Sequence, residues 1–432
     1  MTLNIQEAKL QRLRGLLAAT AMAFLYAAHA KAADTDSCCA DLEARIEELD
    51  AVTKNVRPTT VTISGHVHRA LLQWSDSTER DTYGTDPTNW GTFFEFAGET
   101  KISGKWEAGF LIQIDLPIDE SSSLNQDVDG LQAAPLVGAV NLFITHEDWG
   151  TLTIGKQTEA HDHVTESDLS GTDLFVGPAV TDWNGSFSLR GPAMLALGIR
   201  DFDWSESGAD QIGDGEEASV LRFDTAEIQG FQASVSYGDG EVSAAALRYE
   251  TENKLFSFQS GIGVAHYGEP DRSPCIGTLA AGGCTTLGGS FAVLHKPSRI
   301  SLALAAATIL KDPSDAQLAN AGPDRWGYAK LAQEWKLTEL GATTFYAEYF
   351  RGLRHGRIPD DDDTGAGIAD FSANTETVGI GIMQSFDAAE LQTYIALRHY
   401  SINGHIWTAP AERQPLALDD FQAVMAGARI SF

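Results

Sequence analysis

The last twelve residues alternate strictly between two kinds of side chain, and this pattern constrains the fold more than any other feature. One set of alternate positions, from Val424 to Phe432, is apolar, whereas the other set contains the only charge of the segment, Arg429. Successive side chains of a strand project to opposite faces. The segment is therefore predicted to be a strand with one apolar face that ends on the aromatic ring of Phe432.

The N-terminal residues indicate export from the cytoplasm. Three basic residues precede the apolar run 16–25, and small-residue cleavage patterns follow it at 28–32. This arrangement predicts a secretory signal peptide over residues 1–32, too short to be a spanning helix. No other apolar run reaches the roughly 18 residues that a spanning helix needs. An exported chain of this kind can cross a bilayer only as a closed barrel.

Length and charge narrow the class of protein further. The chain has 432 residues, and 60 acidic residues stand against 30 basic ones, which gives a formal net charge of −30. A surface this acidic argues against nucleic acid as a partner and favours the attraction of cations. The rhythm of strands and turns continues without a break in composition, so residues 58–432 are predicted to form one large β domain.

The connections between the predicted strands alternate between short turns and long polar loops. Short turns at one end and long loops at the other are typical of an antiparallel transmembrane β-barrel. The sequence therefore predicts an all-β fold, a 16-stranded barrel, with 18 strands if 186–190 and 195–201 form a further hairpin. The predicted strands are 60–74, 91–101, 105–116, 137–146, 150–157, 218–224, 230–237, 241–250, 254–267, 285–296, 299–310, 325–337, 341–351, 376–386, 390–400 and 420–432.

Residues 33–57 are predicted to form a short N-terminal helix. Leu42, Ile46, Leu49 and Val56 share one stripe of a heptad pattern. A helix of this length is unstable alone in water, which favours a small bundle between subunits. The alternative is an amphipathic helix that lies on its own domain. In the bundle, Cys38 or Cys39 could bridge two chains.

The remaining cysteines predict a disulfide, and no metal site is expected. Cys275 and Cys284 flank a short loop in a protein that is exported to an oxidising compartment. His161 and His163 could chelate a metal on an extended segment, but no third ligand follows at a clear spacing. No catalytic or phosphate-binding motif is present, so neither an enzyme nor a cofactor is predicted.

Several segments resemble a known family. The stretches "SCCADLEARIEEL" at Ser37–Leu49 and "VTISGHVHRALL" at Val61–Leu72 look like the opening of the alphaproteobacterial (rhizobial-type) outer-membrane porins. So do "GTLTIGKQ" at Gly150–Gln157 and "SVLRFDTAEIQGFQASVSYG" at Ser219–Gly238. The resemblance implies a homotrimeric, sixteen-stranded passive channel in the outer membrane of a Gram-negative bacterium, in contact with membrane lipid and lipopolysaccharide.

The longest loop, 158–217, is the candidate constriction of such a channel. It contains thirteen acidic residues, and Glu159, Asp162, Glu166 and Asp168 lie nearest the preceding strand. The resemblance implies that this loop folds into the barrel. The alternative is a solvated external loop without a role in conduction.

Four arginines are predicted to face the loop from the barrel wall. The apolar neighbours of Arg222, Arg248, Arg398 and Arg429 point outward by strand parity, so the arginines point inward. An arginine that faced lipid at mid-depth would cost about 2–4 kcal/mol. Acids on the loop and arginines on the wall would create a transverse field. Alternatively, these arginines pair with local carboxylates and only hold the loop.

The leading functional prediction is a passive diffusion channel for small hydrophilic solutes and ions, with a mild preference for cations. A solute-specific channel is one alternative. An adhesin or structural anchor with a plugged lumen is another, and a barrel hydrolase would need a Ser–His pair that the sequence does not reveal.

Overall fold

The computed structural model describes residues 59–131, 134–192, 194, 202–208, 210, 212–269, 283–311, 323–358, 369–409 and 412–432. The predicted signal peptide at 1–32 and the predicted helix at 33–57 lie outside these residues. Among the described residues, no helix is both long and apolar enough to span a bilayer.

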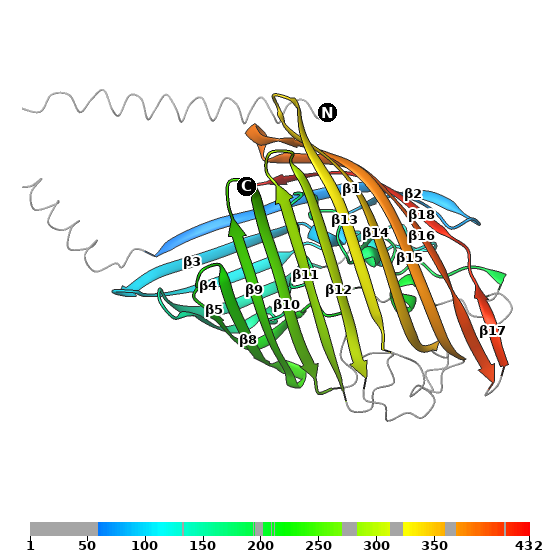
Figure 1. Ribbon diagram of the computed structural model, residues 1–432, viewed down its shortest axis with the longest axis horizontal. Coiled ribbons are helices and arrows are strands. Elements are labelled where there is room, and N and C mark those ends of the chain that lie inside the picture. Colours follow the sequence, from blue (N-terminus) through cyan, green and yellow to red (C-terminus); the bar gives the residue numbers. More distant parts are fainter. Residues whose placement is uncertain are drawn as a thin grey trace, which may run out of the picture. The chain divides into compact units, whose positions relative to one another are not determined.

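Eighteen antiparallel strands form one continuous sheet (Figure 1). Their bounds are β1 Thr60–Ser75, β2 Arg80–Thr85, β3 Phe93–Ser103, β4 Trp106–Asp115, β5 Leu136–His146, β6 Gly150–Thr158, β7 Glu217–Thr225, β8 Phe231–Gly238, β9 Val242–Glu252, β10 Phe256–Tyr267, β11 Cys284–His295, β12 Ile300–Lys311, β13 Arg325–Thr338, β14 Gly341–Ile358, β15 Ala369–Phe386, β16 Leu391–Ala409, β17 Glu412–Ala417 and β18 Phe421–Ser431. The short helices are η1 Thr88–Trp90, η2 Ser121–Ser123, η3 Val180–Trp183, α4 Trp204–Ser207, η4 Asp239–Glu241 and η5 Asp387–Ala389.

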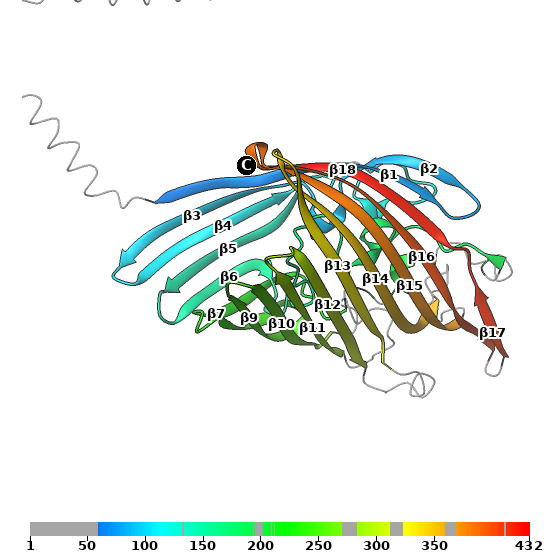
Figure 2. The ribbon, with the colours of Figure 1, turned by 45° about the horizontal axis from the view of Figure 1, so that its top comes forward.

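Sixteen of these strands close into a barrel, as predicted. Each pairs with its neighbours along the chain, and β18 pairs with β1 to complete the ring. Figure 2 shows β3 to β6 and β13 to β16 curving around opposite sides of the interior. The prediction of a 16-stranded antiparallel barrel is confirmed.

The two additional strands differ from the extra hairpin that the sequence suggested. They are β2, which pairs with the C-terminal part of β1, and β17, which pairs with the C-terminal part of β16. Both lengthen hairpins at the end with the long loops. In the segment suggested for the extra hairpin, Ser188 instead makes an isolated bridge to Asp203, and 195–201 lie outside the described residues.

Alternate residues of each strand point to opposite faces of the barrel wall. The outward side chains are mainly apolar and exposed, whereas the inward side chains are mainly buried. On β18, Ile430 is 45% exposed on the outside, whereas Ala423 and Met425 are fully buried inside. Exposed apolar side chains such as Leu142 and Ile154 continue this band on neighbouring strands. A barrel that spans a lipid bilayer needs such a band.

The short turns are tightly built. Gly150, the first residue of β6 after the turn from β5, has a φ of +118°, and a Cβ at this position would lie 2.0 Å from the carbonyl oxygen of Asp224. Only glycine tolerates both constraints. Lys105 of the β3–β4 turn donates to Asp148 of this turn at 2.6 Å. Adjacent short turns are thus tied to one another.

Candidate pore constriction

The described residues between β6 and β7 run through the barrel interior (Figure 2). They contact inward-facing side chains of several strands. They include η3 and α4. We call residues 159–216 the inner loop.

The first part of the inner loop is held by two arginines of β7 and β9. The Arg222 guanidinium donates to the carbonyl oxygens of Thr158 at 3.2 Å and Glu159 at 3.3 Å, and it also pairs with Asp224 of its own strand at 2.9 Å. Arg248 donates to the carbonyl oxygens of Ala160 and Asp162. Both arginines therefore bind the backbone of the loop rather than its carboxylates.

The middle of the inner loop is held by Arg398 of β16. This side chain is fully buried and donates to both carboxylate oxygens of Glu348 on β14, at 2.7 Å and 3.1 Å. It also donates to the carbonyl oxygens of Gly177 at 3.0 Å and Val180 at 3.2 Å. Its guanidinium lies 4.6 Å from the ring centroid of Trp183, a cation–π contact.

Arg429, the fourth predicted arginine, lies apart from this arrangement. It donates to Gln392 on the neighbouring strand at 3.1 Å. A lysine that the sequence analysis did not consider binds the loop instead. Lys330 of β13 donates to Asp168 at 2.7 Å and to the carbonyl oxygen of Val176 at 3.2 Å, with both charged side chains buried.

The wall under the inner loop is lined by glycine and alanine. A Cβ added to Gly263 of β10 would lie 2.7 Å from the Cβ of His161, and one added to Gly288 of β11 would lie 2.7 Å from the carbonyl oxygen of Gly213. Inward positions of β12 are occupied by small buried residues, Ala303, Ala305 and Ala307. Larger side chains would prevent the loop from approaching the wall so closely.

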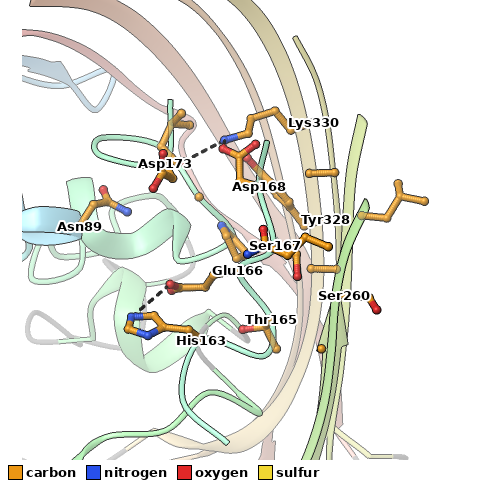
Figure 3. A pocket seen from close by; sticks show the side chains of 18 of the residues that line it. Asn89, His163, Thr165, Glu166, Ser167, Asp168, Asp173, Ser260, Tyr328 and Lys330 are labelled. Atoms are coloured by element: carbon orange, nitrogen blue, oxygen red, sulfur yellow. Dashed lines mark hydrogen bonds and ion pairs between the residues drawn. The ribbon is translucent and has the colours of Figure 1, made fainter. Parts of the chain in front are cut away.

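A cavity of about 380 Å³ lies between the inner loop and the wall of β9, β10, β12 and β13 (Figure 3). Its carboxylates are Glu166, Asp168, Asp173, Asp182 and Glu250, and its cationic side chains are Arg248 and Lys330, with His163 beside them. Figure 3 shows the ion pairs of Lys330 with Asp168 and of His163 with Glu166. The rest of the lining includes the polar side chains of Thr165, Ser167, Gln259 and Ser260, so the cavity suits water and hydrophilic solutes.

A second cavity, of about 490 Å³, is more strongly acidic. Seven carboxylates line it, and the cationic side chains around it are Arg354 and His163. The carboxylates are Asp162, Glu166, Asp182, Glu206, Asp210, Asp214 and Glu216. The two cavities share His163, Glu166 and Asp182. Arg354 donates to the carbonyl oxygens of Ser205 at 3.2 Å and Gly208 at 2.8 Å.

Burial and mutual repulsion shift the pKa of these carboxyl groups. Burial, and then the neighbouring Asp210, raise the pKa of Asp182 well above its usual range. Burial, Glu166 and Asp162 do the same to the pKa of Asp214. Burial opposes ionisation of Asp168 too, but the Lys330 ammonium holds the pKa of Asp168 below its ordinary value. The acidic cavity therefore takes up protons more readily than isolated carboxylates would.

The predicted acids have different surroundings. Glu159 is fully buried and lines neither cavity; it accepts a hydrogen bond from Tyr267 at 3.1 Å. Asp162 faces the second cavity and lies 3.1 Å from Nδ1 of His163. Glu166 borders both cavities, and Asp168 is paired with Lys330.

Three features of the site were not predicted from the sequence: Lys330, Glu348 and the small residues of the inner wall. The same parity argument that located the arginines also places Lys330 and Glu348 inward, so it would have found them. The glycines and alanines were visible as small residues at inward positions of β10 to β12, and a close approach of another segment is one cause of such a pattern.

Neither metal nor cysteine chemistry is prominent at this site. In the part of the chain that the structure describes, no group of three or more His, Cys, Asp and Glu is placed to hold a metal ion. Cys284 is disulfide-bonded, and its predicted partner Cys275 lies outside the described residues.

A closed 16-stranded barrel with an apolar outer band and a polar loop in its interior is the architecture of an outer-membrane channel. The family model described as Gram-negative porin matches residues 18–404, most of the chain. The protein belongs to this family and lies in the outer membrane of a Gram-negative bacterium, where it is a diffusion channel. Among curated proteins, no significant match was found.

Solved structures share this fold. A loop L8 deletion mutant of OmpT, an outer membrane protein of Vibrio cholerae, is 14% identical, with 87% of this chain and 99% of that chain covered and a TM-score of 0.53. An anion-selective porin from Comamonas acidovorans is also 14% identical, with 87% and 100% covered and a TM-score of 0.51. OmpT folded in vitro, in its trimer form, is 14% identical, with 87% and 99% covered and a TM-score of 0.50.

Proposed function

We propose that the protein lets small hydrophilic solutes and ions diffuse passively, with the inner loop as its constriction and a preference for cations. The observation that supports this most directly is the excess of carboxyl groups over cationic side chains around the two cavities. Arg222, Arg248 and Arg398 are engaged by loop carbonyls or by nearby carboxylates. Glu166 borders both cavities, and each cavity is lined by more carboxyl groups than cationic side chains. A surplus of negative charge along a narrow path attracts cations.

A single neutralising substitution tests the preference. Glu166→Gln removes one charge that borders both cavities while it keeps the size of the side chain, so the cation preference should fall. Reversal potentials in planar bilayers under a potassium chloride gradient measure the change. Glu227→Gln is the matched control, because Glu227 is exposed in the turn between β7 and β8. Strong anion selectivity of the wild type, or equal effects of both variants, would contradict the proposal.

Transport measurements also separate the alternatives. A passive channel gives currents that rise linearly with salt and swells liposomes with any small sugar. A solute-specific channel would saturate and be blocked by one substrate. An adhesin or anchor with a plugged lumen would swell no liposomes at all.

We further propose a homotrimer of the alphaproteobacterial (rhizobial) type, in contact with outer-membrane lipid. The heptad stripe within 33–57 and the porin-like sequence segments support this, as does the trimer form of OmpT, a protein of the same fold. Residues 1–32 would be removed on export, and Cys275 would be the disulfide partner of Cys284. Mass determination of the purified protein by light scattering, with and without residues 33–57, tests the oligomer and the role of the helix.

A further inference from the structure

One tryptophan inside the barrel is exposed, whereas the other described tryptophans of the interior are buried. Trp90, the last residue of η1, is 37% exposed and lines the cavity of about 380 Å³. The tryptophans at inward strand positions or in the inner loop are at most 4% exposed; they are Trp74, Trp183, Trp204 and Trp326. Hydrophobic burial therefore does not account for the exposed part of Trp90.

Two histidines of β1 hold the backbone of η1, which lies in the connection between β2 and β3. Nδ1 of His68 donates to the carbonyl oxygen of Trp90 at 2.8 Å. Nε2 of His66 donates to the carbonyl oxygen of Gly91 at 2.8 Å. Both histidines are buried, and Nε2 of His68 lies 2.8 Å from the hydroxyl group of Tyr394 on β16. The exposed indole is thus attached to a backbone that two strands of the wall hold in place.

The indole shares its cavity with accessible carboxylates. Figure 3 shows Asp173 and Glu166 of the inner loop between Asn89, the neighbour of Trp90, and the wall strand β13. Asp173 is exposed and forms no ion pair with any described residue. The side chain of Glu166 is 34% exposed. Glu250 of β9 is a third exposed carboxylate of the lining.

The cationic side chains of the lining already have partners. Lys330 is buried and paired with Asp168 at 2.7 Å. Arg248 donates to two carbonyl oxygens of the inner loop. His163 lies 3.6 Å from Glu166. A solute that enters the cavity therefore meets exposed carboxylates and an exposed indole, whereas it must compete with existing partners for a cationic group.

These two features together favour one class of solute. An alkylated ammonium ion is attracted by carboxylates, and its weakly hydrated surface can contact the face of an indole in a cation–π interaction. A small inorganic cation keeps its hydration shell and gains little from an aromatic ring. A neutral solute could stack on the indole, but it would leave the charge of the carboxylates unused.

We infer that this cavity is a binding site for small organic cations of the alkylated ammonium class. Trp90 distinguishes these cations from inorganic ones, and Glu166, Asp173 and Glu250 supply the attracting charge. The inference rests on the proposed function, because it names a class of solute that the cation-preferring channel admits.

Current block in planar bilayers tests the inference, with the full-length protein and tetramethylammonium as the probe. In potassium chloride, added tetramethylammonium chloride should reduce the current through the wild type in a saturable manner. Trp90→Ala should weaken this block roughly fivefold, the effect of one cation–π contact. Trp90→Phe should recover part of the block, because a smaller aromatic ring remains. Ammonium chloride, whose cation has no apolar surface, should not block the wild type.

A matched variant and a neutral probe serve as controls. Trp335→Ala removes an indole of similar exposure, 39%, from the outer face of β13 and should leave the block unchanged. All variants should keep the heat-modifiable gel migration of a folded barrel. Equal block of the wild type and Trp90→Ala would overturn the inference. Equal block by tert-butanol, a neutral molecule of similar size, would overturn the assignment to cations.

A separate measurement on the same channels reports on the proposed function. The reversal potential under a potassium chloride gradient gives the preference between inorganic ions without the probe. A cation preference combined with no block by tetramethylammonium would overturn the inference alone and leave the proposed function standing. Strong anion selectivity would instead contradict the proposed function, whatever the probe does.

Discussion

At the scale of single residues, the interior is organised by charged side chains that bind backbone. Arg398 is the clearest case, since it donates two hydrogen bonds to Glu348 and two to carbonyl oxygens of the inner loop. A buried arginine of this kind holds a loop more rigidly than a carboxylate contact alone, because carbonyl oxygens cannot swing away from the chain.

Arg398→Met should loosen the inner loop. The substitution removes the loop contacts and leaves Glu348 buried without its partner, which costs about 3–5 kcal/mol when a buried pair is broken on one side. Single-channel recordings should show larger and noisier conductance. The double variant Arg398→Met/Glu348→Gln should recover part of the stability while it keeps the noise. An unchanged conductance in both variants would refute the anchoring role.

The acidic cavity should respond to pH above the range of ordinary carboxyl groups. Since the pKa of Asp182 and that of Asp214 are raised, these groups are neutral at a pH where an ordinary aspartate, with a pKa of about 3.9, is still charged. Cation preference should therefore decline as the pH falls through the raised values. Reversal potentials from about pH 8 to about pH 4 measure this. Asp182→Asn should reduce the pH response, and a flat response in the wild type would contradict the assignment.

At the scale of elements, the position of the inner loop depends on the small residues of β10, β11 and β12. Gly213 of the loop approaches β12 so closely that a Cβ on it would lie 2.7 Å from the Cβ of Ala307. The small side chains of these strands thus allow the inner loop to lie in close contact with the wall.

Neighbouring residues of β12 offer a matched pair of substitutions. Ala307→Leu enlarges an inward residue under the loop and should displace it, with an overpacking cost of about 1–3 kcal/mol and an altered conductance. Ala306→Leu enlarges the adjacent outward residue, which is exposed to the lipid side, and should change neither. Thermal unfolding and single-channel recordings compare the two. Similar behaviour of both variants would argue against close packing of the loop.

The elements were largely predictable from the sequence, whereas the site was predictable only in part. All sixteen barrel strands were located, because lipid outside and polar groups inside impose a period of two on every strand. β2 and β17 were missed, since they lie beyond the apolar band and lack that pattern. Parity also placed Arg222 and Arg398 inward, but it could not give their partners. Those contacts join residues far apart in sequence, such as Arg398 and Gly177.

At the scale of the whole molecule, closure of the barrel relies on the pairing of β1 with β18. Gly65 and Phe432 exchange two backbone hydrogen bonds, at 3.1 Å and 3.3 Å, and the register continues up to Ser75 and Gln422. The seam therefore joins the two ends of the described barrel.

Removal of residues 421–432 should prevent closure, because β1 and β16 would then expose unpaired backbone groups within the bilayer. The truncated chain should lack the heat-modifiable migration of folded barrels on gels. Removal of 412–417 is the control, since β17 pairs with β16 alone and stands outside the ring of sixteen. A folded product from the first deletion would show that closure can occur without β18.

The seam has a consequence for biogenesis. β1, near the start of the chain, can pair with β18 only after the end of the chain has been made. Until the two strands pair, each has an unpaired edge to which a strand of another polypeptide could bind. A chain whose synthesis stops early would be an aggregation-prone fragment rather than a smaller pore. Every copy that lacks β18 therefore has two unpaired strand edges, one on β1 and one on β16.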